Sequence, residues 1–230
     1  MDSQYSPVCV EAGAAPRHSH DQHGNYPLHA ALQRLRHFQI TSKYTDESPL
    51  EPLVQDLLDA GADPTVRDSR GNTALHYLAD NGLAEQWYGD GARALCAHFC
   101  DHGVDVNARN DLGCTALEIL MDDPGEIDKQ RWSYHFAEQR KVPSIQEVHR
   151  EVFGMFDKAS GWWTEQDGKG RTLLHLVARH ATDKATFRTK YLLAKGVDPS
   201  VKDNEGRTAG DVATQSNNQA VIELLGQTER

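Results

Sequence analysis

The sequence contains no apolar run that approaches the roughly 20 residues of a membrane-spanning helix, and no signal-peptide core follows Met1. Its four cysteines lack the spacing of a disulfide framework. Lysine and arginine total 24 against 34 aspartates and glutamates, so the formal net charge is -10. Because phosphate neutralisation needs a basic face, this charge excludes a general nucleic-acid binder. These features predict a reduced protein of the cytoplasm or nucleus that binds neither nucleic acid nor membrane. We expect it to be a monomer.

The sequence also lacks the motifs by which many enzymes are recognised. It has no glycine-rich phosphate loop, no nucleophile elbow and no acid and base paired in a supporting context. Hydrophobic residues make up 38% of the chain, which is low for a compact two-layer domain but sufficient for an ordered fold. We therefore predict a protein that is not an enzyme and that holds neither a cofactor nor a metal.

What the sequence does contain is one pattern repeated five times. The letters GNTALHYLA from Gly71 return as GRTLLHLVA from Gly170. The aligned glycines are Gly24, Gly71, Gly113, Gly170 and Gly206. An aspartate stands three residues before each of them except Gly113, where Asn110 takes its place. Each block precedes a second apolar stretch; in the first two repeats that stretch shows the spacing of one helical face, as at Leu53, Val54, Leu57 and Leu58.

These units resemble ankyrin repeats, whose pattern is D-x-x-G, then T-P-L-H-x-A-A, then V-V-x-x-L-L-x-x-G-A-D-V-N-A. Two short helices cannot bury their apolar faces alone, so neighbouring repeats stack to make the core. The resemblance implies an all-α fold, an ankyrin-type α-solenoid of five helix pairs joined by β-turn hairpin loops. We expect a flexible N-terminal tail at 1–17 and the array at 18–230, with repeats at about 20–66, 67–108, 109–166, 167–201 and 202–230.

The repeats are longer than the usual period of about 33 residues. The extra length falls between the first and second helices of repeats 1 to 3, and the largest insert is at about 122–144. Within it, the residues Asp123-Pro124-Gly125-Glu126 are typical of a helix start, so we expect an added helix in the third repeat. A glycine ends each of the first four second helices, where positive φ is favoured, at Gly61, Gly103, Gly161 and Gly196.

Several histidines and cysteines invite a catalytic or metal-binding interpretation. His29, His76 and His175 recur one repeat apart, and the resemblance implies that this histidine forms structural hydrogen bonds with the turn. Cys96 and Cys100 occupy positions that are apolar in the other second helices, which favours a core role. The three histidines in residues 17–23 are interpreted as a solvated entry to the first turn.

The resemblance implies protein recognition through a concave groove formed by the hairpin tips and the exposed ends of the first helices. The candidate partner-binding residues are Arg70, Asn72, Asp80, Asp111, Leu112, Lys169, Arg171, Arg179 and Arg207. Charges at these tips are mostly acidic in repeats 2 and 3 and mostly basic in repeats 4 and 5, an arrangement that would orient a partner of opposite polarity. Because exposed charges contribute little to stability, reversing Arg171 and Arg207 is expected to weaken binding without lowering the melting temperature.

Two tryptophans stand where the other repeats have a small residue followed by aspartate. Trp162 and Trp163 follow Gly161, and the hairpin after them counts one residue short. Either the indoles pack against the insert, near Trp132 and Phe136, or they face solvent and anchor a partner. The insert must bury its own apolar side, which favours the structural interpretation.

The sequence therefore predicts a non-catalytic scaffold or adaptor that binds a protein or peptide partner in its groove. The alternative is a regulatory or targeting ankyrin segment of a larger enzyme or receptor. A chaperone for a basic client, suggested by the net charge, is a third hypothesis.

Overall fold

The computed structural model describes residues 26–33, 50–80, 83, 89–122, 144–159 and 161–228. All regular secondary structure in these residues is helical, and none of them forms a β-strand. The chain divides into two compact units, one of residues 1–83 with 88–116 and one of residues 84–87 with 117–230. Among the described residues, no helix is long and apolar enough to cross a membrane.

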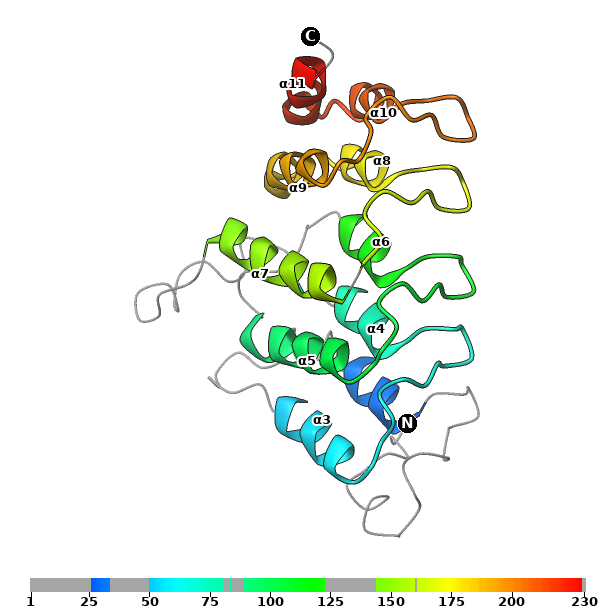
Figure 1. Cartoon of the computed structure of the whole chain (residues 1–230), viewed down its shortest axis with the longest axis vertical. Coiled ribbons are helices and arrows are strands. Elements are labelled where there is room, and N and C mark those ends of the chain that lie inside the picture. The colour runs from blue at the N-terminus through cyan, green and yellow to red at the C-terminus, as the bar shows by residue number, and fades with distance from the viewer. Residues whose placement is uncertain are drawn as a thin grey trace. The chain divides into compact units, whose positions relative to one another are not determined.

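The described residues of the first compact unit form helices in two repeats. Residues 27–33 are helical, and α3 (Leu50–Asp59), α4 (Ala74–Asp80) and α5 (Gly89–Asp101) follow. Helix α5 packs against both α3 and α4 (Figure 1). Val54, Leu75 and Phe99 are completely buried, so the apolar faces predicted from the sequence form the core of this unit.

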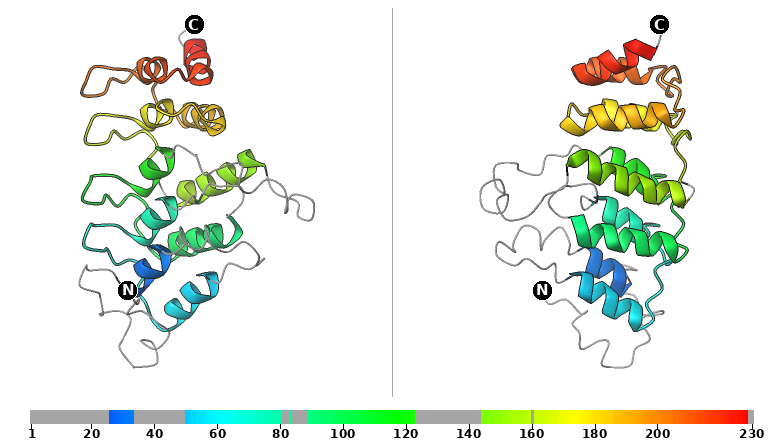
Figure 2. Two further views of the ribbon diagram at one scale, coloured as in Figure 1. Left: turned by 180° about the vertical axis from the view of Figure 1, so that it is seen from behind. Right: turned by 60° about the vertical axis from the view of Figure 1, so that its left-hand side comes forward.

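The second compact unit contains most of α6 (Ala116–Met121), then α7 (Ile145–Lys158), α8 (Leu173–Ala178), α9 (Asp183–Ala194), α10 (Ala209–Gln215) and α11 (Gln219–Thr228). Helix α8 packs against α9 and α10, and α11 packs against the same two helices. Both views in Figure 2 show α8 and α9 as one pair beside the pair of α10 and α11. Helices of only 6 or 7 residues, such as α8 and α10, cannot stand alone, so this mutual packing is what stabilises them.

A tight turn precedes each of the helices α4, α6, α8 and α10. In the turn before α8, Asp167 N–H donates to Arg171 O and Gly170 N–H donates to Asp167 O, both at 2.9 Å. The same two hydrogen bonds occur at Asp68, Asn110 and Asp203. The glycine of each turn has φ between 72° and 78°, a conformation that costs a residue with a Cβ about 1–2 kcal/mol. The aspartate and glycine of the repeat are thus explained by this turn.

Successive turns are joined by a backbone hydrogen bond within each compact unit. Asp111 N–H donates to Arg70 O in the first unit, and Asn204 N–H donates to Lys169 O in the second, each at 2.9 Å. Figure 1 shows the loops before α8 and α10 projecting from the same side of their helices. The repeat therefore stacks through its turns as well as through its helices.

The predicted positive φ at the helix-end glycines is confirmed at Gly61, Gly103 and Gly196 but is wrong at Gly161. Gly161 N–H donates to Phe156 O, which is the bond that Ala62, Val104 and Val197 make to their own helices. Gly161 therefore occupies the position of those small residues, one place later than the sequence suggested. Trp162 consequently replaces the aspartate, and the hairpin has its full length.

Several sequence-based expectations concern residues outside the described ranges. These are the N-terminal tail at 1–17, the histidines of 17–23, and the interior of the insert with Asp123, Trp132 and Phe136. The insert is bounded by Met121, where α6 ends, and by Ser144, which caps α7.

Candidate functional site

The recurring histidine connects one repeat to the next. Nδ1 of His76 accepts hydrogen bonds from the backbone N–H and the hydroxyl of Thr73, so its Nε2 carries the proton that points at Cys114 O, 3.0 Å away. His175 makes the same contacts with Thr172 and with Arg207 O. Burial lowers the pKa of His76, which keeps its ring neutral. The predicted structural role is confirmed for both residues.

The two cysteines of α5 differ in burial. Cys96 is completely buried, and Cys100 is half-buried. A hydrogen bond with Cys100, together with burial, raises the pKa of the Cys96 thiol, so this thiol is protonated at neutral pH. Within the described ranges, no three histidine, cysteine or acidic side chains lie close enough together to hold a metal.

The candidate residues of the first compact unit lie on its turns and at the end of α4. Asn72 accepts a hydrogen bond from Asn110 Nδ2 at 2.9 Å, which ties its side chain to the next turn. Leu112, at the tip of that turn, is 86% exposed, and Asp80 is the last residue of α4. Arg70 and Asp111 join two turns through their backbones. Among these candidate residues, Leu112 is the one with a large apolar side chain, and that side chain faces solvent.

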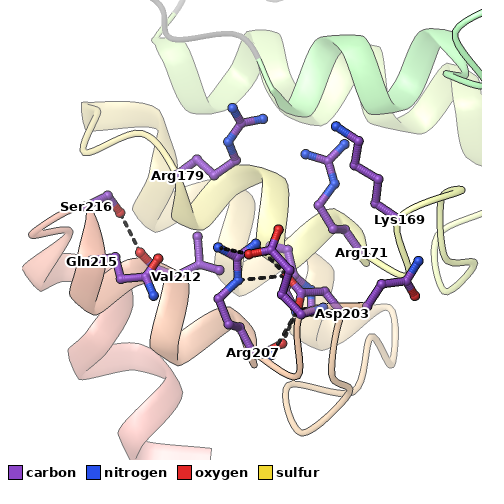
Figure 3. Close-up of a pocket in the computed structure, with 11 residues that line it drawn as sticks. Lys169, Arg171, Arg179, Asp203, Arg207, Val212, Gln215 and Ser216 are labelled. Atoms are coloured by element: carbon purple, nitrogen blue, oxygen red, sulfur yellow. Dashed lines mark hydrogen bonds and ion pairs between the residues drawn. The ribbon is translucent and has the colours of Figure 1, made fainter.

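The candidate residues of the second compact unit surround one open pocket of about 470 Å³ (Figure 3). Four cations that were predicted from the sequence line this pocket. Lys169 and Arg171 flank the turn glycine of repeat 4, Arg179 lies at the end of the first helix of that repeat, and Arg207 lies on the turn of repeat 5. We refer to this cavity as the basic pocket. The rest of its lining is His175, Asp203, Asn204, Glu205, Val212, Gln215 and Ser216. The stacking of two successive repeats therefore brings together side chains as far apart in the sequence as Lys169 and Ser216.

Two arginines of the basic pocket are held by the carboxylate of their own turn. Arg171 pairs with Asp167 at 2.6 Å, and Arg207 pairs with Asp203 at 2.8 Å. Burial pushes the pKa of each aspartate upward, but the hydrogen bonds from the arginine and the turn backbone outweigh it, so both pKa values lie below the ordinary one. Arg171 is only 16% exposed. Its reversal is thus expected to disturb the turn, which corrects the sequence-based view of a freely exposed charge.

The third arginine of the basic pocket binds a carboxylate at the start of the insert. Arg179 Nη1 lies 2.8 and 3.0 Å from the two carboxylate oxygens of Asp122, and His180 Nε2 lies 3.1 Å from one of them. Asp122 belongs to the acidic group in the sequence-based charge pattern, and Arg179 belongs to the basic group. The ion pair therefore offsets one charge of each group.

Lys169 differs from the three arginines because no carboxylate of the described residues pairs with it. Its side chain extends in the same direction as those of Arg171 and Arg179 (Figure 3). The opposite wall of the pocket lies on α10 and its C-cap, with Val212 and Gln215 on the helix and Ser216 as the cap. None of these three residues was among the candidates named from the sequence. The repeat register was the available signal, since α10 follows the next turn.

The two tryptophans have separate environments. Trp163 is 8% exposed and packs between α7 and α9, with ring centroids 5.6 Å from Phe153 and 5.2 Å from Tyr191. Lys195 lies over the Trp163 ring at 5.8 Å from its centroid. Trp162 is 51% exposed. Trp163 is therefore buried against the second helices, and half of the Trp162 surface faces solvent. The predicted packing against the insert, near Trp132 and Phe136, falls outside the described residues.

Comparisons with known proteins point to long proteins that carry ankyrin repeats. No family model matches the chain. It is 25% identical over 165 residues to a transient receptor potential cation channel subfamily A member 1 homolog of Caenorhabditis elegans, a match that covers 72% of this chain and 11% of the relative. It is 30% identical over 122 residues to neurogenic locus notch homolog protein 1 of Danio rerio, covering 53% and 4%, and 27% identical to that of Homo sapiens over the same shares. Both kinds of relative contain ankyrin repeats. The chain thus spans a small part of each relative, and its similarity to them is consistent with a protein built from ankyrin repeats.

Proposed function

We propose that this chain is an ankyrin repeat module that binds a protein partner through the surface formed by its turns and first helices. Three features support the fold assignment: the Asp-x-x-Gly turns, the histidine that reaches the next turn, and the paired helices. The similarity to ankyrin-containing relatives agrees with them. The module acts as an intracellular, monomeric scaffold or adaptor and has no catalytic role.

The basic pocket is the observation on which this function depends. Turn and first-helix residues of two successive repeats, Lys169, Arg179 and Arg207 among them, line one open cavity on a rigid framework of stacked turns. Its walls are polar and charged, with Val212 as the apolar contribution. Such a surface suits a protein segment better than a small apolar ligand, because small-molecule sites are mostly apolar and enclosed.

The test compares proteins retained from cell extract by the wild-type chain with those retained by Lys169→Glu. The matched control is Lys190→Glu, which makes the same charge change at an exposed position of α9 outside the pocket. We expect at least one protein to be retained by the wild type and by the control but lost with Lys169→Glu. Identical retention by all three proteins would contradict the pocket as the binding surface.

A second candidate function is a regulatory or targeting segment within a larger protein. It is favoured by the comparisons, because the matched relatives extend far beyond the matched region. Transcript sequencing across the codon for Arg230 is the test. A reading frame that continues into a further domain would support this candidate, and a stop codon there in every transcript would refute it.

A further inference from the structure

We propose that the basic pocket binds an acidic peptide segment, whose Asp or Glu side chains pair with Lys169, Arg171 and Arg179. This inference rests on the proposed function, since it names the chemistry of the partner that the pocket would take. The proposed ligand groups are carboxylates of a polypeptide, and the test includes a phosphorylated peptide as the alternative anion.

The basic pocket gathers cations on a chain that is acidic as a whole. The chain as a whole has a formal net charge of -10, yet four cations line this one cavity against two acids, Asp203 and Glu205. Both of these acids are already paired with Arg207. Arg171 and Arg179 are paired as well, with Asp167 and Asp122, which lie outside the lining. Lys169 is the cation of the pocket that no carboxylate of the described residues pairs with, so its charge is the one most available to a ligand. A local basic site on an acidic protein favours association with acidic segments over basic ones.

The hydrogen bonds inside the pocket indicate which donors are available. Arg171 uses Nε and Nη2 on Asp167, at 2.7 and 2.6 Å, and within the described part of the chain its Nη1 has no such partner. The Asp167 pair therefore fixes the guanidinium plane while leaving one edge with a donor. Lys169 adds an ammonium whose flexible stem can follow a ligand. Figure 3 shows the two side chains directed to the same side of the pocket.

Arg179 shows that a cation of this pocket can hold a carboxylate, because it pairs with Asp122 of the same chain. The two carboxylate oxygens of Asp122 contact Arg179 Nη1, and the Arg179 side chain remains 43% exposed. Arginine forms charge-assisted hydrogen bonds to carboxylates with a planar geometry that suits Asp and Glu side chains. A single exposed ion pair contributes little binding free energy. Binding thus requires several acidic side chains, which a peptide segment supplies and a single free carboxylate does not.

Peptide carboxylates fit the pocket better than phosphates. Glu205 is 70% exposed at the pocket, where it would repel a doubly charged phosphate more strongly than a singly charged carboxylate. A nucleic-acid backbone would meet the acidic remainder of the molecule, which opposes binding. On the α10 wall, the Gln215 side chain carries both a donor and an acceptor, the pair that a peptide group requires.

The experiment uses a fluorescein-labelled oligoglutamate peptide and the full chain, with binding followed by fluorescence anisotropy. We expect binding by the wild type that weakens as salt rises. Lys169→Glu should weaken it about tenfold, the effect of about 1.4 kcal/mol. Lys190→Glu should change it less than about twofold, since that residue lies on α9 away from the pocket. Circular dichroism verifies that the variants fold. Arg179→Gln is the second pocket variant and should also weaken binding.

Three results would overturn the inference. The first is that the wild type does not bind oligoglutamate, the second is that Lys169→Glu and Lys190→Glu weaken binding equally, and the third is that an oligolysine peptide binds as well as oligoglutamate. A phosphoserine peptide that binds where oligoglutamate does not would replace carboxylate with phosphate as the ligand chemistry. If oligoglutamate fails while a cellular protein still depends on Lys169, the proposed function stands and only the acidic-segment inference falls. If neither depends on Lys169, both fall.

Discussion

Trp163 provides the sharpest test of the packing between the second helices of repeats 3 and 4. The indole is 8% exposed and contacts the rings of Phe153 and Tyr191, and Lys195 lies over its face. Replacing a buried tryptophan with alanine typically costs about 3–5 kcal/mol, and lost ring contacts of this kind account for about 1 kcal/mol of that. Trp162→Ala is the matched control, because that indole is 51% exposed and its loss should cost about 1 kcal/mol or less.

The assay is chemical unfolding of both variants by urea, followed by far-UV circular dichroism. Trp163→Ala should shift the midpoint strongly, and Trp163→Phe should recover a large part of the loss because it keeps an aromatic ring between α7 and α9. If the two alanine variants unfold at the same denaturant concentration, the assignment of a structural role to Trp163 alone is wrong. A larger effect of Trp162→Ala would reverse the assignment.

Three further predictions test the turns and their connections. Gly170→Ala should destabilise the chain more than Gly206→Ala in thermal melts: both glycines have positive φ, but an added Cβ at Gly170 would lie 3.0 Å from Asn204 N, whereas at Gly206 it would meet nothing within 4 Å. His175→Ala should cost about 1–3 kcal/mol in urea unfolding, because it leaves the buried Thr172 N–H without its acceptor and removes the bond to the Arg207 carbonyl; an unchanged midpoint would refute the bridging role. The lowered pKa of Asp167 contributes stability that is fully present above its ordinary pKa of about 3.9 and is lost as pH falls through the lower native value. Thermal melts of the wild type should therefore decline below about pH 4, and Asp167→Asn should decline less steeply.

Much of the local structure was predictable from the repeat pattern. The turn aspartates and glycines and buried positions such as Val54 and Leu57 follow from spacing, because each repeat makes the same contacts with its neighbour. The resemblance to ankyrin repeats implied the hydrogen bonds of His76 and His175. The prediction for Gly161 was wrong because a glycine near the end of a helix was assumed to be the residue with positive φ. Only the bond from Gly161 N–H to Phe156 O reveals the register. A sequence count cannot distinguish a glycine that needs positive φ from one that replaces alanine.

The charges of the candidate site were predictable, but their pairing was predictable only in part. Arg171 stands four residues after Asp167, and Arg207 four after Asp203, across a turn that brings the two ends of each interval together. These pairs were therefore accessible to reasoning from the turn. The pair of Arg179 with Asp122 spans 57 residues and depends on how α8 packs near the end of α6, so no local pattern indicates it. A charge tally treats all four cations of the basic pocket as equal ligands for a partner. Their pairing makes them unequal: Arg171 and Arg207 hold the turns in shape, Arg179 already binds a carboxylate, and Lys169 is the cation whose reversal tests recognition with the least damage to the fold.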